Sequence, residues 1–330
     1  MDPRPPALDG PTTAPIPFLD GAALSALGID AADAVAAIER VIRQRAAGVA
    51  QSAAKAVMLP PDGRYLMAAL AATDEPPLLV TKSVVLNPRN PARGLPQVDG
   101  VVTVLDAERG TPVALLDAKW ITAIRTAALS LTAARHLARA DSAVIAFAGC
   151  GVQARSHLTA FAEGYPLAQV RLLGRGPENI ERLARDAEER GMEAVVCHSG
   201  AELLTGADIV VSSVTYSATL TPFLDAGDLA PGAFAAVTDL AAPWHRASFA
   251  ALDRVVIDDL AQEAAMPNKL LAPEVVAGDL SGLVLGELPG RGGAGERTAF
   301  VFRGHALGDL ALAVLACERA GLVRSGAGHD

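Results

Sequence analysis

The glycines at the centre of the chain are the residues whose spacing points most directly to chemistry. The apolar run Ala143–Ala148 stops at Gly149-Cys150-Gly151, and a helical pattern that contains Ala154 follows at once. A strand, the pattern G-x-G-x-x-A and a helix, in this order, are typical of a turn that holds the phosphates of a dinucleotide. The N–H groups at the start of this helix would attract phosphate charge. The alternative is an ordinary turn between a strand and a helix.

The next strand bears on the choice of cofactor. It ends in Leu172-Leu173-Gly174-Arg175, where a carboxylate would bind a ribose 2′-hydroxyl group and favour NAD. The sequence has no carboxylate there, and Arg175 has the charge to pair with a 2′-phosphate. We therefore expect NADP as the cofactor, with NAD as the alternative. An arginine on the exposed rim of the sheet would explain Arg175 without any cofactor.

Two cations lie in apolar surroundings, where an unpaired charge is costly. Lys82 is the one charge in the strand-like run Leu78–Leu86, and Arg125 is the one charge in the segment Thr122–Ala128, near the start of the helical pattern Ala118–Ala138. A lysine near a carboxylate or an imine can steer both charge and proton. An arginine offers a planar fork that binds a carboxylate through two hydrogen bonds. The alternatives are an edge-strand lysine that faces solvent and an arginine on a helix surface.

Asp239 is placed where a ligand is expected in a parallel sheet. It follows the predicted strand Ala233–Val237, so it lies at the carboxyl end of that strand. Doubly wound sheets bind their ligands at this end. The alternative is an aspartate that caps the next segment.

These residues need two kinds of structural support. Before the glycine turn, an amphipathic helix, Asp33–Ala47, precedes strand and turn patterns that continue to Leu116, which predicts an antiparallel sheet with one helix. From Ala143 onward, strands and helices alternate, which predicts a parallel sheet. The length of 330 residues suits two domains, each with its own core.

Composition limits the classes of partner. A net charge of −9 and a pI near 5.2 argue against nucleic acid. The three cysteines are far apart, which gives neither metal-type spacing nor a disulfide framework, so we expect no metal. No apolar run has membrane-spanning length, and the proline-rich N-terminus has no signal-peptide core. These features predict a soluble cytoplasmic protein without membrane contact.

Several segments together resemble the ornithine cyclodeaminase/mu-crystallin family. They are Gly94–Ala138, the GCGVQARSHLTAF segment that starts at Gly149, Thr238-Asp239, and the Gly-His-Ala-Leu-Gly-Asp segment from Gly304 to Asp309. The resemblance implies NAD(P)-dependent chemistry at the Cα–N bond of small amino or imino acids. It covers the chain from roughly Val35 to Arg319.

The resemblance also implies the fold. We expect an α/β protein in which a Rossmann-type doubly wound parallel sheet, residues 129–304, accompanies an α+β domain built from both termini, residues 1–128 and 305–330. The second domain would bind substrate and form a homodimer. The sequence supports the homodimer independently, because the first sheet is apolar and has only Asp33–Ala47 to cover it.

Site residues follow from the family pattern. The resemblance implies that Lys82 contacts substrate, that Arg125 binds the α-carboxylate, and that Asp239 acts as a base, so we expect Lys82 and Asp239 to be the catalytic residues. Lys55 stands where the family often has an arginine, and Gln97 stands where a serine or threonine is common; we expect both to bind substrate. The expected cofactor-binding residues are Gly149, Gly151, Val152, Gln153, Ala154, Arg175, Thr126 and Gly304.

Three functional outcomes remain open at this point. The first is a cyclodeaminase or ketimine reductase, in which a hydride moves between NAD(P) and Cα. The second is an amino-acid dehydrogenase of the alanine dehydrogenase type. The third is a non-catalytic NADPH-binding protein, as the crystallin members of the family imply.

Overall fold

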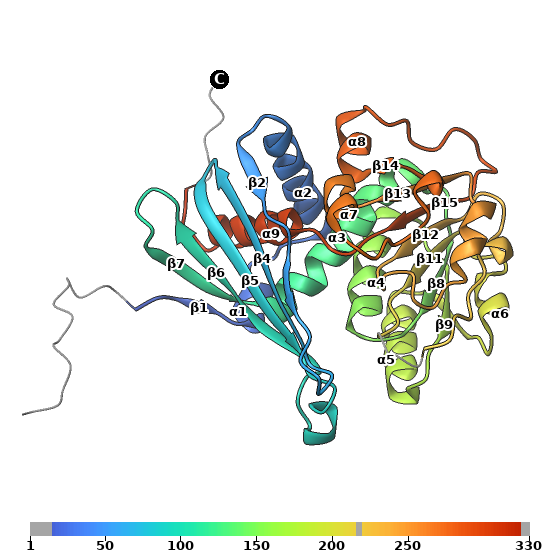
Figure 1. Ribbon diagram of the computed structural model, residues 1–330. Helices are drawn as coiled ribbons and strands as arrows, with labels where there is room; N and C mark the ends of the chain where they lie inside the picture. The colour runs from blue at the N-terminus through green and yellow to red at the C-terminus, as the bar shows by residue number, and fades with distance from the viewer. Residues whose placement is uncertain (1–14, 216–219, 325–330) are drawn as a thin grey trace, which may run out of the picture.

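The computed structural model describes residues 15–215 and 220–324, which form two sheets with helices between them (Figure 1). The first sheet, sheet A, is antiparallel apart from its short first strand. Its strand order is β1 (Phe18–Leu19), β7 (Pro112–Asp117), β6 (Val98–Asp106), β5 (Pro77–Leu86), β4 (Tyr65–Asp74) and β2 (Ala50–Ser52), with β3 (Ala56–Met58) also paired to β4. The predicted antiparallel sheet is confirmed.

Sheet A has one covered face. Burial alternates along β4 and β5, so every second side chain points to the same side. The helices on the covered side are α2 (Ala31–Ala46), α3 (Ala118–Leu137) and α9 (Ala306–Arg319), with α1 (Gly21–Ser25) beside β7. Lys82 lies on this inner face and is 1% exposed. It is therefore not a solvent-facing lysine on an edge strand.

The second sheet, sheet B, is parallel throughout. Its strand order is β10 (Glu193–Val196), β9 (Gln169–Leu173), β8 (Val144–Ala148), β11 (Ile209–Ser212), β12 (Phe234–Val237), β15 (Thr298–Val301), β13 (Arg254–Ile257) and β14 (Val276–Asp279). The chain moves from β8 outward through β9, then returns to β11 on the other side. This reversal leaves a crevice at the carboxyl ends of β8 and β11, where α/β sheets bind ligands.

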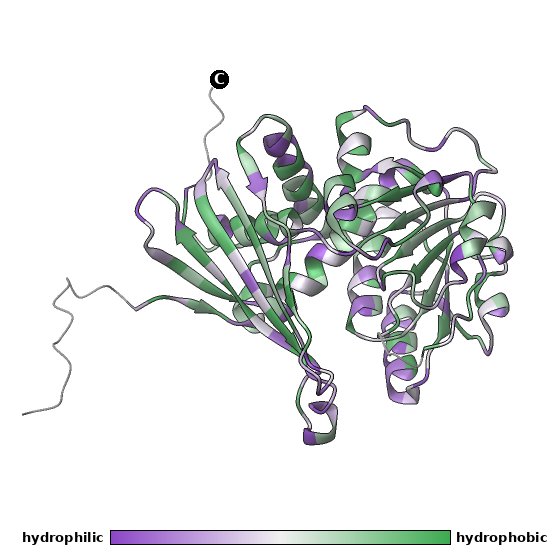
Figure 2. Ribbon diagram, viewed as in Figure 1, coloured by the Kyte–Doolittle hydropathy of each residue, from purple (hydrophilic) through white to green (hydrophobic). Residues whose placement is uncertain are grey.

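Both faces of sheet B are buried, which confirms the doubly wound α/β fold. Along β8, Ile145 and Phe147 belong to the larger core under α3 and α4 (Val152–Gly164), whereas Ala146 and Ala148 belong to a second core. Figure 2 shows the strands of sheet B as largely hydrophobic along their length. The remaining helices are α5 (Pro177–Glu188), α6 (Gly200–Leu204), α7 (Leu260–Ala265), α8 (Leu280–Leu285) and the short turns η1 (Pro91–Arg93), η2 (Ala226–Asp228), η3 (Arg246–Ala251) and η4 (Pro273–Val275).

Helices α3 and α9 connect the two sheets. The predicted domain boundary at residue 128 falls inside α3, which continues without a break to Leu137. Helix α9 follows β15 of sheet B and returns to pack on α2, α3 and strand β4. The predicted domain ranges therefore stay a prediction. Within the described residues, no helix combines the length and apolar character that crossing a membrane requires.

Candidate functional site

The glycine turn is shaped to receive an anionic group. Gly149 has φ +90°, and a Cβ atom there would lie 2.8 Å from the carbonyl oxygen of Ser213. At Gly151 a Cβ atom would meet nothing within 4 Å, so this position faces open space. Gly151 begins α4 without a side-chain cap, and Ala154 is fully buried beneath the turn. The first N–H groups of α4 are thus available to phosphate oxygens.

A cavity of about 850 Å³ extends from this turn. It passes the ends of β8, β9 and β11 and the start of α6, with lining residues that include Gly149, Gly151, Arg175, Asn179 and Ser199. Arg175 lies on the wall of this cavity, as its predicted role requires. The size of the cavity, its open glycine and the uncapped helix all fit the adenosine and phosphate part of a dinucleotide.

A buried ion cluster lies on the inner face of sheet A. Lys82 Nζ donates a 2.6 Å hydrogen bond to Asp309 Oδ1, and Arg125 Nε lies 3.2 Å from the same oxygen. The three side chains come from β5, α3 and α9, and each is at most 8% exposed. The C-terminal helix is therefore required to complete a cluster that begins in the first sheet.

Lys55 and Gly304 extend this cluster toward sheet B. Lys55 Nζ donates to the carbonyl oxygen of Arg303 at 2.9 Å. Gly304 has φ +87°, and a Cβ atom there would lie 2.8 Å from Arg125 Nη1 and 3.3 Å from Lys55 Nζ. The two cations thus flank the backbone of Gly304, where a side chain would displace the Arg125 guanidinium and the positive φ disfavours residues other than glycine.

The electrostatics of the cluster favour an anionic ligand. Atoms Nε and Nη1 of Arg125 are buried and have no hydrogen-bond partner among the described residues. Burial, followed by the charge of Arg125, lowers the pKa of Lys82 to about 7 and that of Lys55 to about 8. Burial alone would raise the pKa of Asp309, but the charges of Lys82 and Arg125 hold it below its usual value. A carboxylate would satisfy the unpaired guanidinium atoms and offset the excess positive charge.

Asp239 lies at the carboxyl end of sheet B, as predicted. Its Oδ1 accepts a 3.0 Å hydrogen bond from Ser212 Oγ, and its Oδ2 accepts one of 3.0 Å from the Val214 N–H group. Burial raises its pKa to about 7. The next two residues, Leu240 and Ala241, have φ values of 60° and 55°, a left-handed conformation that non-glycine residues rarely adopt outside special sites. The hydrogen bonds recorded for the Asp239 side chain go to the end of β11 and beyond it, not to the Lys82 cluster.

Gln153 and Thr126 lie where α4 meets α3. The Gln153 side chain donates to the carbonyl oxygen of Thr122 at 3.5 Å, and Thr126 Oγ1 donates to the same oxygen at 2.6 Å. Gln153 Oε1 is buried and has no partner among the described residues. This acceptor lies on the second residue of α4, two residues beyond Gly151 of the glycine turn, and suits a ligand N–H or O–H donor.

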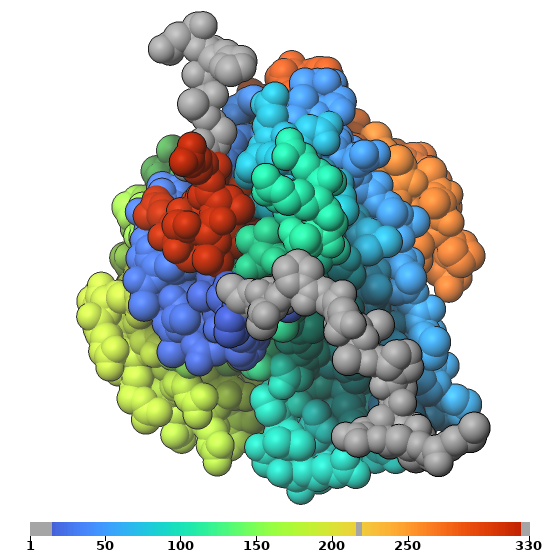
Figure 3. Space-filling view, turned by 90° about the vertical axis from the view of Figure 1, so that its left-hand side faces the viewer, coloured from blue at the N-terminus to red at the C-terminus, as the bar shows by residue number. Residues whose placement is uncertain are grey.

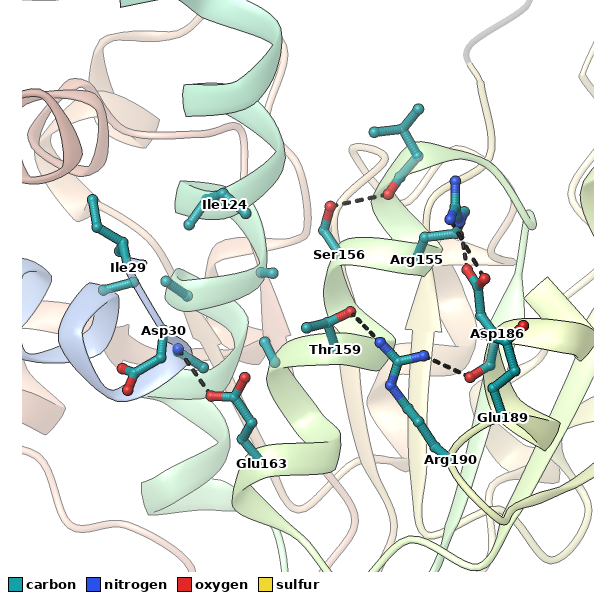
Figure 4. A pocket seen from close by; sticks show the side chains of 16 residues that line it. Ile29, Asp30, Ile124, Arg155, Ser156, Thr159, Glu163, Asp186, Glu189 and Arg190 are labelled. Atoms are coloured by element: carbon teal, nitrogen blue, oxygen red, sulfur yellow. Dashed lines mark hydrogen bonds and ion pairs between the residues drawn. The ribbon is translucent and has the colours of Figure 1, made fainter. Parts of the chain in front are cut away.

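Two predicted residues have side chains that lie apart from both groups, although the backbone N–H of Val152 belongs to the start of α4 beside the glycine turn. Gln97 is opposite Asn87 at the tip of the β5–β6 hairpin, five residues along β5 from Lys82, or about 16 Å at the rise of a strand. The Val152 side chain is 69% exposed and lines a different hollow of about 410 Å³ between α2, α3, α4 and α5. In that hollow Arg155 pairs with Asp186, and Arg190 with Thr159 (Figure 4).

Asp309 is the member of the ion cluster that the sequence prediction omitted. Two features of the sequence could have indicated Asp309. It is the one charged residue in the apolar stretch ALGDLALAVLA, and a buried Lys82 requires an anionic partner. His305, by contrast, helps to hold the structure in place, because protein groups contact both of its ring nitrogens. Its Nδ1 accepts a hydrogen bond from the Leu307 N–H group, and its Nε2 lies 2.7 Å from Asp259 Oδ2.

Comparison with known proteins shows the family of the chain. Residues 25–322 match the model of the ornithine cyclodeaminase/mu-crystallin family. The chain is 30% identical over 241 residues to the ketimine reductase mu-crystallin of Rattus norvegicus, covering 72% of this chain and 74% of that protein.

Two solved structures share the fold. An archaeal alanine dehydrogenase dimer with bound NAD superposes with a TM-score of 0.81 at 26% identity, over 92% of this chain and 96% of the other. A Thermococcus litoralis Delta(1)-pyrroline-2-carboxylate reductase in complex with NADH and L-proline has a TM-score of 0.83 at 24% identity, over 92% and 97% of the two chains. The glycine turn, the buried cations and these similarities lead to one conclusion: the chain belongs to the ornithine cyclodeaminase/mu-crystallin family.

Proposed function

We propose that this protein catalyses NAD(P)-dependent hydride transfer at the Cα–N bond of a small amino or imino acid, as an imine reductase or an ornithine cyclodeaminase. The observation that supports this most is the buried Arg125 guanidinium, whose free N–H groups lie beside Gly304 at the junction of the two sheets. A guanidinium of this kind is suited to bind a carboxylate, and Gly304 follows β15 at the carboxyl edge of the dinucleotide-binding sheet.

Different residues of the chain bind the substrate and transfer its protons. Arg125 binds the α-carboxylate, and Lys82, held by Asp309, adds positive charge on the same side. Asp239, whose pKa of about 7 lets it accept a proton near neutral pH, acts as the base toward the amine of an amino-acid substrate. When bound, the nicotinamide supplies or accepts the hydride. The shared requirement of reductase and cyclodeaminase is that Cα is held by its carboxylate in a fixed orientation.

For the cofactor, we favour NADP over NAD. Arg175 on the wall of the large cavity provides a guanidinium where a 2′-phosphate would lie. The two solved structures cited above contain NAD or NADH, so the preference of this chain depends on Arg175.

A second copy of the chain is the partner that we propose for sheet A. The face away from the helices carries Leu66, Leu70, Leu79 and Val85, which are 38–47% exposed. Figure 3 shows strands of this sheet, in blue to teal, at the surface. Exposed apolar side chains gathered on one sheet face are typical of an association surface, and two-fold pairing is the commonest arrangement.

One set of assays tests the activity. The protein is incubated with NADPH and small cyclic imino acids, and with NAD(P)+ and ornithine or lysine, while cofactor absorbance and ammonia are followed separately. Oxidation of NADPH by an imino acid indicates a reductase, and ammonia without net cofactor change indicates a cyclodeaminase. Tight NADPH binding with neither reaction would overturn the proposal in favour of a binding protein.

A further inference from the structure

Lys55 differs from the family pattern in a way that changes its chemistry. The family often has an arginine here, and arginine does not release its proton in proteins. A lysine can release a proton once burial has lowered its pKa. The question is therefore whether the position of Lys55 suits proton transfer or only charge.

The position of Lys55 places a proton donor beside the carboxylate-binding arginine. Lys55 lies between β2 and β3 and reaches the backbone that follows β15, where its Nζ donates to the Arg303 carbonyl oxygen at 2.9 Å. Nζ and Arg125 Nη1 both lie within 3.3 Å of the point that a Cβ atom of Gly304 would occupy. In an α-imino acid, the nitrogen is one bond from the carbon that carries the carboxylate. A carboxylate on Arg125 therefore brings the nitrogen within reach of this region.

Lys82 is less suited to the same task. Its Nζ is held by Asp309 Oδ1 at 2.6 Å and lies 3.5 Å from Thr122 Oγ1, so two of its three protons have acceptors. The one side-chain hydrogen bond recorded for Lys55 among the described residues goes to a neutral carbonyl group. Two protons of Lys55 thus remain for a ligand.

The charges around Lys55 allow it to cycle between two protonation states. Burial and the charge of Arg125 lower its pKa to about 8, while Asp258 and Asp309 act in the opposite direction. Asp258 Oδ2 is itself buried without a partner among the described residues. The charged groups that face Lys55 come from α3, α9, β5 and the ends of β13 and β15, and they are Arg125, Asp309, Lys82, Asp258 and Arg303.

We propose that Lys55 is the catalytic acid that protonates the imine nitrogen of the substrate; this inference rests on the proposed function. One N–H bond of the ammonium breaks and one N–H bond forms on the imine, which gives an iminium ion. A bound reduced cofactor would supply the hydride, with its two electrons, to Cα, so that the C=N bond would become the C–N bond of an amine. Lys55 is left as a neutral amine and recovers its proton from solvent.

The variant Lys55→Arg separates the acid from a simple charge. It retains the cation and restores the residue common in the family, but it has no transferable proton. With Delta(1)-pyrroline-2-carboxylate and NADPH, we expect kcat to fall by about 10²–10⁴-fold while KM changes little. The decline of wild-type kcat above pH 8 should also disappear from the residual activity. A raised KM with normal kcat, or no change at all, would identify Lys55 as a carboxylate ligand and overturn the proposal.

Two controls accompany this variant. Lys119→Arg makes the same replacement in a lysine that is 41% exposed and pairs with Asp99, so its kinetics should match the wild type. If Lys55→Arg does not fold, Lys55→Ala takes its place, and added methylammonium should restore part of its kcat. Failure of methylammonium to restore any activity in folded Lys55→Ala protein would contradict the acid role.

A spectroscopic measurement tests the acid without turnover. The carbon-13 shift of the labelled C=N carbon is recorded for the imino acid bound to protein that carries no reduced cofactor. We expect an iminium shift in the wild type at pH 7.5 and a neutral imine shift in Lys55→Arg. The turnover assays and this measurement can fail separately. If the wild type reduces no imino acid, the proposed function is wrong, but the carbon-13 shift of the bound imino acid still shows whether Lys55 protonates its nitrogen. A neutral imine in the wild type, or no binding at all, would overturn it.

Discussion

At the scale of single residues, the site depends on cations that are buried before any substrate arrives. Arg125 is the clearest case, because its Nη1 has no hydrogen-bond partner among the described residues and its Nε has only the Asp309 carboxylate at 3.2 Å, without hydrogen-bond geometry. Such a group is costly in isolation and becomes favourable when a carboxylate binds. The free energy of binding at this site should therefore concentrate on the carboxylate.

Replacement of Arg125 tests this directly. Arg125→Ala removes a desolvated bidentate contact worth roughly 2–5 kcal/mol, so kcat/KM should fall by about 30-fold to several thousand-fold. Arg125→Lys should recover only part of the loss, since lysine lacks the fork. Cofactor affinity should barely change, because the glycine turn is on another element. Steady-state kinetics beside a melting curve provide the measurement, and an unchanged kcat/KM in folded Arg125→Ala protein would exclude Arg125 from the site.

A second residue-scale prediction concerns Arg175 and the cofactor. Arg175→Ala should weaken NADPH binding by about 10- to 100-fold, the value of one charge-assisted contact, and leave NADH binding nearly unchanged. Fluorescence titration of both cofactors gives the ratio. Equal losses for the two cofactors, or tighter binding of NADH by the wild type, would show that Arg175 does not select NADP.

The pH dependence of anion binding follows from Lys82. Its pKa is lowered to about 7, so the empty site loses positive charge as pH rises through that value. Affinity for a planar carboxylate such as pyrrole-2-carboxylate should decrease from pH 6.5 to pH 9 in calorimetric titrations.

The same shift affects stability with the opposite sign. Between the folded pKa of about 7 and the model-peptide value of 10.5, the unfolded chain binds more protons at Lys82 than the folded chain. This group therefore makes the folded state more stable as pH rises through that window. Anion affinity that stays constant over the same range would contradict the lowered pKa.

At the scale of elements, α9 is as important to the cluster as the strand that carries Lys82. Asp309→Asn should leave Lys82 and Arg125 buried beside a neutral partner and lower the free energy of unfolding by about 3–5 kcal/mol. Glu318→Gln, on the same helix, removes a partner of Arg40, whose side chain is 39% exposed, and should cost about 1 kcal/mol or less. Urea denaturation of the two variants makes the comparison. Similar decreases in the free energy of unfolding for both variants would show that the Asp309 cluster contributes no more stability than an exposed ion pair.

Helices and strands with a regular hydrophobic pattern could be predicted from the sequence. The pairing of short strands with their neighbours in the sheet could not. The run Leu78–Leu86 and the helical pattern Ala118–Ala138 match β5 and α3 to within a residue, because hydrophobic periodicity is local. Strand β15 was not predicted, since its four residues follow a glycine-rich loop and are too short to show a period. It nevertheless lies between β12 and β13, a pairing that only the tertiary fold determines.

The residues of the candidate site also fall into a group that the sequence could predict and a group that it could not. The glycine turn and the two isolated cations were visible as residue types in unusual surroundings. The partner of Lys82 was not deduced, because Asp309 is 227 residues away and nothing local joins them. Gln97 was included on family position alone, and its place at the hairpin tip could not be deduced from the strand pattern.

At the scale of the whole molecule, the outer face of sheet A makes a prediction about assembly. Leu70→Lys places a charge at the middle of β4 on a side chain that is 47% exposed, so it should convert the expected dimer to a monomer. Leu260→Lys, with 48% exposure on α7, should leave the dimer intact. Light scattering at micromolar concentration gives the mass. A monomeric wild type would contradict the dimer, and a dimeric Leu70→Lys would place the interface elsewhere.

The return of α9 to the first sheet has a consequence for synthesis of the protein on the ribosome. The strands of sheet A emerge early, but the carboxylate that neutralises Lys82 is at residue 309 of 330. Until that helix leaves the exit tunnel, Lys82 has no anion to accompany it into the core, so β5 cannot be packed in its final environment. The nascent first domain must therefore wait for α9, and a chain that stops before α9 should be degraded rather than accumulate as a half-active fragment.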